Sequence, residues 1–344
     1  MYKVKLSSKH SALALIAVEV FILGFQLVAT ICLSLFAPDM DEVTEYFILL
    51  FITQIAIGVA AIGTLLASRR DTGCSLRDYT PSAVRPMDVL RLFLITCGIL
   101  LFSSPLANGF SMLLEGLGVS LPASPVSFST GTEFLLGLVF VCVMPAIFEE
   151  LANRGVILNG LTRMGAWPAI LLSAFIFAIM HGNPHQLIHQ FILGAVMAYA
   201  VLVSGNILSS VIIHFANNFI ALLLTFLTAN ATVVEVTPPG TEVIFAPIVL
   251  ALYGAMMFGG FCLFSSQIKR WTQSNILAYV HARPEKRESY VRWRDAGGFF
   301  GYVSKLIRWR TDEHQKERLS PLMILAILLA LMILALNTYT MVAL

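Results

Sequence analysis

The chain has 344 residues, of which 58% are hydrophobic and only 12% are charged, and its net charge is +2 at pH 7. A soluble domain carries about twice that charged fraction, so the composition excludes an ordinary soluble protein and indicates that lipid is the main solvent. The five cysteines show no C-x-x-C spacing, which favours neither a disulfide framework nor a thiolate metal site. No Gly-rich phosphate loop is present, so no nucleotide chemistry and no nucleic-acid partner are expected.

Apolar runs in chain order predict an all-α polytopic membrane protein with about nine transmembrane helices. The runs cover approximately residues 11–37, 46–67, 89–114, 133–161, 167–181, 185–203, 207–227, 243–264 and 320–344. They suggest three parts: N-terminal helices over residues 1–132, a core over 133–228 that carries the polar motifs described below, and C-terminal helices over 229–344. The composition also makes membrane lipids expected partners, whereas the oligomeric state is left open.

The distribution of basic residues predicts the orientation of these helices. Most of the 22 Lys and Arg residues lie in the N-terminal segment, in residues 69–91 and in residues 269–318. With nine spans all three regions fall on one side, and the excess of basic residues in cytosolic loops predicts a cytosolic N-terminus in a multi-pass cell-membrane protein. Residues 265–319 are expected to form a basic cytosolic loop. Within it, residues 298–310 are either solvated or an amphipathic helix in the headgroup layer.

The fourth apolar run ends in two adjacent carboxylates and an arginine, Glu149, Glu150 and Arg154. Ionised groups at membrane depth persist when they are paired, face a cavity or have a function. Adjacent residues on a helix point about 100° apart, whereas Glu150 and Arg154, four residues apart, share a face in the favourable acid-first order. We therefore expect Glu150 to pair with Arg154 and Glu149 to face a cavity, where its carboxylate can act as a general base.

Two later spans contribute histidines and an asparagine at helical spacing. His181 ends its span one turn after Phe177, and His214 lies one turn before Asn218, so each pair shares a helix face. An imidazole N–H and an amide NH₂ can donate to an oxyanion. The pattern predicts that Glu149 and His181 hold and deprotonate a water, while His214 and Asn218 stabilise the developing negative charge.

The same residue types allow a metal site. Glu149, His181 and His214 would satisfy a catalytic zinc site, which needs three protein ligands and one open position. His181, His185 and His189 are also spaced by four residues, but a proline interrupts the helix after the first of them. We therefore interpret His185 and His189 as polar residues near a helix end, with zinc ligation as the alternative.

These three motifs resemble the CPBP intramembrane protease family. E-E-x-x-x-R ends at Arg154, F-x-x-x-H runs from Phe177 to His181, and H-x-x-x-N runs from His214 to Asn218, in separate spans. The family is also called Abi and includes the type II CAAX prenyl endopeptidases. The resemblance covers residues 134–227 and implies an intramembrane endopeptidase whose substrate is a membrane-associated or lipid-anchored peptide or protein. It also implies that Glu149 and His181 activate water and that His214 and Asn218 form the oxyanion hole.

The resemblance leaves prenyl recognition and metal dependence open, and it suggests substrate contact at Phe177. The alternatives use the same buried charges without proteolysis, as a polar lock between helices, a bacteriocin-immunity or partner-binding protein, or a secondary transporter. One geometric difficulty is that His181 lies roughly 20 Å from the start of its span, deeper than Glu149. A fifth and sixth helix that form a hairpin stopping short of the far surface would bring the two residues together.

Overall fold

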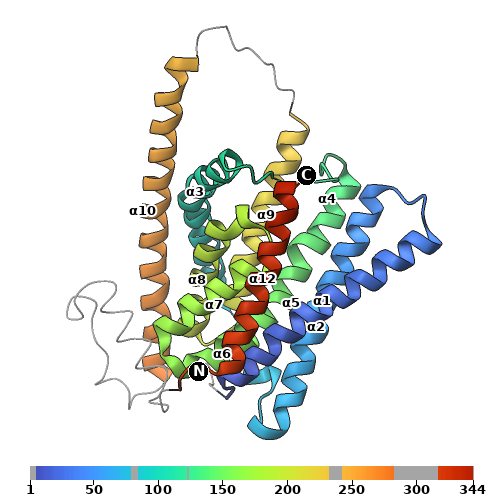
Figure 1. Cartoon of the computed structure of the whole chain (residues 1–344). Helices are drawn as coiled ribbons and strands as arrows, with labels where there is room; N and C mark the ends of the chain where they lie inside the picture. The colour runs from blue at the N-terminus through green and yellow to red at the C-terminus, as the bar shows by residue number, and fades with distance from the viewer. Residues whose placement is uncertain (1–4, 79–83, 122–123, 232–241, 283–316, 344) are drawn as a thin grey trace.

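The computed structural model describes residues 5–78, 84–121, 124–231, 242–282 and 317–343, and every regular element in them is helical (Figure 1). Eight helices are long and apolar enough to cross a membrane, which confirms an all-α polytopic membrane protein. They are α1 (Ser8–Phe36), α2 (Glu42–Thr72), α3 (Pro86–Gly116), a composite helix (Gly131–Met164), the segment Pro184–Ser204 that contains α8 (Leu187–Ser204), α9 (Leu208–Ala229), α10 (Glu242–Ala282) and α12 (Pro321–Ala343).

The fifth predicted span is a shorter helix, α7 (Ala166–Met180), of 15 residues. At 1.5 Å per residue it is about 22 Å long, less than the roughly 30 Å of a bilayer core. Gly194 of α8 lets the two helices touch, because a Cβ there would lie 3.1 Å from Ala174 Cα. His181 is the residue that caps α7. That the hairpin stops short of the far membrane surface stays a prediction.

The composite helix contains α4 (Gly131–Gly137), α5 (Met144–Glu150) and α6 (Leu158–Leu161), separated by π-helical segments at Leu138–Val143 and Leu151–Ile157. Pro145 accounts for the first segment, because it has no N–H to bond Val141 O four residues earlier. The second segment begins directly after Glu150 and carries Arg154. Both irregularities lie beside the predicted catalytic carboxylates, where π-helical turns are frequent in proteins.

The N-terminal residues hold α1 against the end of the composite helix. Asn159 Oδ1 accepts hydrogen bonds from the backbone N–H groups of Lys5 and Leu6, at 3.1 and 3.0 Å. Ser11 Oγ donates to Ile157 O at 2.9 Å. In Figure 1, α1 and α2 lie side by side on one flank of the bundle, and α10 stands on the opposite flank beside α3. The helices that carry the predicted motifs lie between these flanks.

Several basic residues meet at one end of the bundle, which we call the basic end. Lys5 Nζ lies 3.0 Å from Asp78 Oδ2, and Arg163 donates to Lys5 O at 3.4 Å. Arg85 donates to Ser274 Oγ at 3.0 Å. These contacts bring the N-terminus, the connection after α2, the start of α3 and the last part of α10 to the same end, as the nine-span arrangement predicts. The cytosolic location of this end stays a prediction.

The expected break after the eighth span is wrong. The sequence predicts a loop from Ser265, but α10 continues without interruption to Ala282. No Gly or Pro follows Ser265 within the helix, and Ile268, Trp271 and Ile276 are buried at helical spacing. The drop in hydropathy therefore reports a change of surroundings and not the end of the helix. The amphipathic helix expected at residues 298–310 lies outside the described residues.

Candidate active site

The expected ion pair between Glu150 and Arg154 is present and fully buried. Arg154 Nη1 lies 3.0 Å from Glu150 Oε1, and both side chains have 0% exposure. Arg154 Nη2 donates to Gly194 O of α8 at 3.1 Å, and the guanidinium stands 4.5 Å above the ring of Phe177 in α7. Desolvating two charges is expensive, so these added contacts are needed to offset the cost. Arg154 thus joins the composite helix to both helices of the hairpin.

Glu150 also orients His214, which the sequence analysis did not anticipate. His214 Nδ1 lies 2.9 Å from Glu150 Oε1, the oxygen that also accepts from Arg154. A carboxylate held ionised by an arginine can only accept, so His214 Nδ1 carries the proton. The other ring nitrogen, Nε2, faces Glu149 Oε2 at 4.0 Å. A neutral His214 therefore presents a bare Nε2, and it becomes a donor on that side only as the imidazolium.

The side chain of His181 has its tautomer set by the backbone. Its Nδ1 lies 2.7 Å from Phe177 O, and because a carbonyl can only accept, Nδ1 donates and Nε2 of the neutral ring stays an acceptor. The ring of Phe177 contacts both histidines edge-on, with centroids 4.7 Å from His181 and 5.7 Å from His214. Asn337 of α12 donates to Gly182 O at 3.1 Å and so fixes the turn after His181. The short hairpin brings His181 to the same cluster as His214.

Phe177 is 1% exposed, and its ring contacts the guanidinium and both imidazoles. Phe177 therefore packs against three of the polar side chains of the site and helps to hold them in place. The substrate contact expected for Phe177 finds no support among these contacts and stays a prediction.

Gln54 of α2 belongs to the cluster, although it lies outside the motifs. Its Nε2 donates to Glu149 Oε1 at 3.0 Å, and the side chain is buried. The hydrogen bond restrains one carboxylate oxygen and leaves Oε2 facing His214. A signal for Gln54 existed in the sequence, since an amide in the middle of an apolar span needs a polar partner. Nothing in the sequence indicated which partner that would be.

Asn218 is the last member of a chain of hydrogen bonds. Its Nδ2 donates to Val141 O at 2.8 Å, and its Oδ1 accepts from Asn217 Nδ2 at 3.1 Å. Asn217 Oδ1 lies 3.0 Å from His189 Nε2, and His189 Nδ1 lies 2.8 Å from Ser103 Oγ. Amide and carbonyl oxygens only accept, so the direction is fixed: Ser103 donates to a neutral His189, which donates onward. His189 therefore helps to position Asn218 and is more than a helix-end polar residue.

The three regularly spaced histidines have separate partners. His181 bonds its own helix, His185 Nδ1 lies 3.0 Å from Ser111 Oγ, and His189 bonds Asn217. Within the part of the chain that the structure describes, no group of three His, Cys, Asp or Glu side chains is close enough to hold a metal ion. As it stands, the donor set does not fit a three-ligand zinc site. Zinc binding by Glu149, His181 and His214 stays a prediction for metal analysis.

Two cavities in the described part of the chain do not coincide with this cluster. One, of about 850 Å³, lies between α10 and the α7–α8 hairpin, and the other, of about 480 Å³, lies between α2 and the start of the composite helix. No predicted site residue lines either one, so neither is the cavity expected to face Glu149. The Glu149 side chain nevertheless keeps 15% exposure, whereas Glu150 has none. Glu149 is thus the more exposed carboxylate of the pair.

A helical membrane bundle with a buried carboxylate and histidine cluster defines the class: a multi-pass membrane protein with ionisable side chains gathered in its interior. Residues 131–220 match the family described as type II CAAX prenyl endopeptidase Rce1-like, in agreement with the resemblance of the motifs. The matched range contains every predicted site residue but well under half of the chain. No curated protein and no solved structure matches the chain.

Proposed function

We propose that the protein is an intramembrane endopeptidase that hydrolyses a peptide bond of a membrane-associated or lipid-anchored substrate with an activated water. The observation that carries the proposal is the setting of His214. One ring nitrogen is bonded to buried Glu150, and the other faces Glu149 at 4.0 Å. A structural ion pair needs only Glu150 and Arg154, so the added imidazole and the second carboxylate favour acid–base chemistry.

The proposed nucleophile is a water held by Glu149 Oε2 and His181 Nε2. Both atoms are acceptors, since Gln54 occupies Glu149 Oε1 and the His181 proton is held at Nδ1. Glu149 takes one proton from the water as its oxygen bonds to the substrate carbonyl carbon. Glu149 then returns that proton to the departing amide nitrogen as the C–N bond breaks, which leaves a carboxylic acid and an amine. The acid still carries the second proton of the water, and transfer of that proton to the amine gives a carboxylate and an ammonium group.

The negative charge on the former carbonyl oxygen is assigned to His214 and Asn218. Donation from His214 Nε2 requires the imidazolium, and the Glu150 and Glu149 carboxylates face the two nitrogens of this ring. Asn218 Nδ2 uses one hydrogen on Val141 O, and the amide has a second hydrogen to donate. Preorganised donors of this kind stabilise the transition state more than the ground state because they need no reorganisation.

The test uses the purified chain in lipid nanodiscs with two peptide sets, prenylated C-terminal CAAX peptides and unmodified membrane-associated peptides. The name of the matched family supports testing the prenylated set first. Products are identified by mass spectrometry in H₂¹⁸O, where attack by water places one ¹⁸O in the new carboxylate. Zinc content is measured on the same sample, and stoichiometric zinc would support the metal alternative.

Glu149→Gln and His214→Ala should abolish cleavage. Glu19→Gln is the matched control, since it removes another buried carboxylate from a different span, α1. Cleavage that survives Glu149→Gln would overturn the proposal. Complete inactivity of the folded wild-type chain on both peptide sets would instead favour the non-catalytic immunity, binding or transport alternatives.

A further inference from the structure

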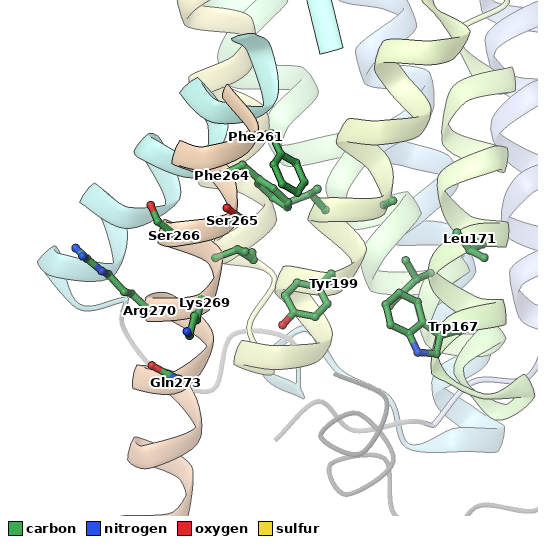
Figure 2. Close-up of a pocket in the computed structure, with 14 residues that line it drawn as sticks. Trp167, Leu171, Tyr199, Phe261, Phe264, Ser265, Ser266, Lys269, Arg270 and Gln273 are labelled. Atoms are coloured by element: carbon green, nitrogen blue, oxygen red, sulfur yellow. The ribbon is translucent and has the colours of Figure 1, made fainter. Parts of the chain in front are cut away.

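The cavity of about 850 Å³ lies between α10 and the α7–α8 hairpin, within the size range of sites that hold small molecules. Figure 2 shows side chains from these three helices around it. Trp167, Phe261 and Phe264 supply aromatic walls, and α8 adds Ala195 and Val196. The walls are therefore mostly apolar, as expected for a site occupied from within the bilayer.

Contacts at both ends of the cavity fix the separation of α10 from the hairpin. At one end α10 crosses α3 in backbone contact, because a Cβ on Gly98 would lie 2.6 Å from Phe264 N, and one on Gly260 would lie 2.6 Å from Phe102 N. At the basic end, Tyr199 and Thr272 share a 2.9 Å hydrogen bond between α8 and α10. Between these contacts α10 stands away from the hairpin. The cavity is thus built into the helix packing.

The polarity of the cavity changes along α10. Phe261 and Phe264 lie toward the apolar end, whereas Lys269, Arg270 and Gln273 line the end nearer the basic end of the bundle (Figure 2). An occupant that matches this gradient has a long apolar part and a negatively charged head. A peptide strand fits poorly, since apolar walls would leave its backbone groups without hydrogen-bond partners.

The cavity is separate from the candidate active site, although α8 forms a wall of both. Ala195 and Val196 face the cavity. The preceding residue, Gly194, faces inward, where its carbonyl accepts from Arg154 and its Cα side packs on Phe177. No site residue lines the cavity, so a substrate anchor held there would have α8 between itself and Glu149.

We propose that the cavity between α10 and the α7–α8 hairpin binds one anionic phospholipid, with its phosphate at Lys269 and Arg270 and one acyl chain along Phe261 and Phe264. The lipid fills the space between α10 and the hairpin and supports α8 from outside. Charge complementarity selects the anionic head, and the apolar walls select the acyl chain. This proposal goes beyond the protease function and does not depend on it.

The experiment measures retention of phosphatidylglycerol and phosphatidylcholine by the purified full chain with native mass spectrometry. Phosphatidylglycerol should bind more tightly, and Lys269→Ala with Arg270→Ala should weaken it by about 30-fold, taking each basic residue near an anionic head at its usual contribution. The matched control, Arg69→Ala with Arg70→Ala, removes two exposed charges at the end of α2 and should leave binding unchanged.

Two further arms identify the ligand. Ala195→Trp should fill the cavity and reduce binding of the acyl chain, with thermal melting used to verify that the variant is folded. Glycerol phosphate should fail to displace the lipid, because it lacks the acyl chain; displacement by it would point to a simple phosphate site and overturn the proposal. Equal retention of the two lipids, or an equal loss in the control pair, would also overturn it.

Discussion

Replacing Gln54 with leucine tests how the proposed general base is held. Leucine keeps the volume of the side chain but removes the 3.0 Å hydrogen bond to Glu149 Oε1. Hydrogen bonds to charged groups contribute about 1.5–3 kcal/mol, equivalent to roughly 10- to 150-fold in rate at 1.36 kcal/mol per tenfold. Glu149 keeps 15% exposure, so water replaces part of the lost contact. We therefore expect a loss near the lower limit, about tenfold in kcat.

The assay is steady-state cleavage of the best peptide over a range of pH. A positioning role predicts that Gln54→Leu lowers kcat and leaves KM nearly unchanged, since the carboxylate loses the donor that restrains it. Thr53→Ala is the control, because Thr53 is the neighbouring polar residue on α2 and bonds Gln26 instead. Unchanged kcat in Gln54→Leu, or an equal loss in Thr53→Ala, would refute the assignment.

Three other substitutions test the packing around the site. His189→Leu should lower kcat about tenfold, because it leaves the buried amide oxygen of Asn217 without its donor. His189→Gln should restore part of the lost activity. An unchanged kcat in His189→Leu would contradict a positioning role for His189. Gly160→Ala should lower the free energy of unfolding by about 1–3 kcal/mol, because the added Cβ would collide with the backbone of Ser7. The control is Gly109→Ala, which has open space around the added Cβ and should melt at the wild-type temperature. Arg154→Lys should reduce both thermal stability and cleavage, since lysine cannot bond Glu150 and Gly194 together while stacking on a ring; retention of both would show that charge alone suffices.

Local spacing made part of the site predictable. The pairing of Glu150 with Arg154 depends only on their separation by four residues on one helix, so the sequence predicts it directly. The contact of His214 with Glu150 joins residues 64 positions apart, and no local pattern encodes it. Gln54 is 95 positions from Glu149, and only the packing of α2 against the composite helix brings them together.

The fold shows the same division between local and long-range information. Hydropathy located the apolar helices, including the short α7, because a segment that lies in lipid must consist mainly of apolar residues. It failed at Ser265, where α10 leaves its most apolar part but keeps its backbone hydrogen bonds. His189 was undervalued for a related reason: its importance depends on Asn217 and Ser103, which belong to two other helices.

Pro145 has an effect that reaches beyond its own helix. Because it lacks an N–H, Pro145 cannot donate to Val141 O, and Asn218 Nδ2 donates to that carbonyl from α9. Pro145→Ala would give the composite helix a competing internal donor for that carbonyl. Such a chain would gain helical regularity and lose part of the restraint on Asn218. The free energy of unfolding would then rise, while the proposed oxyanion donor would be held less firmly.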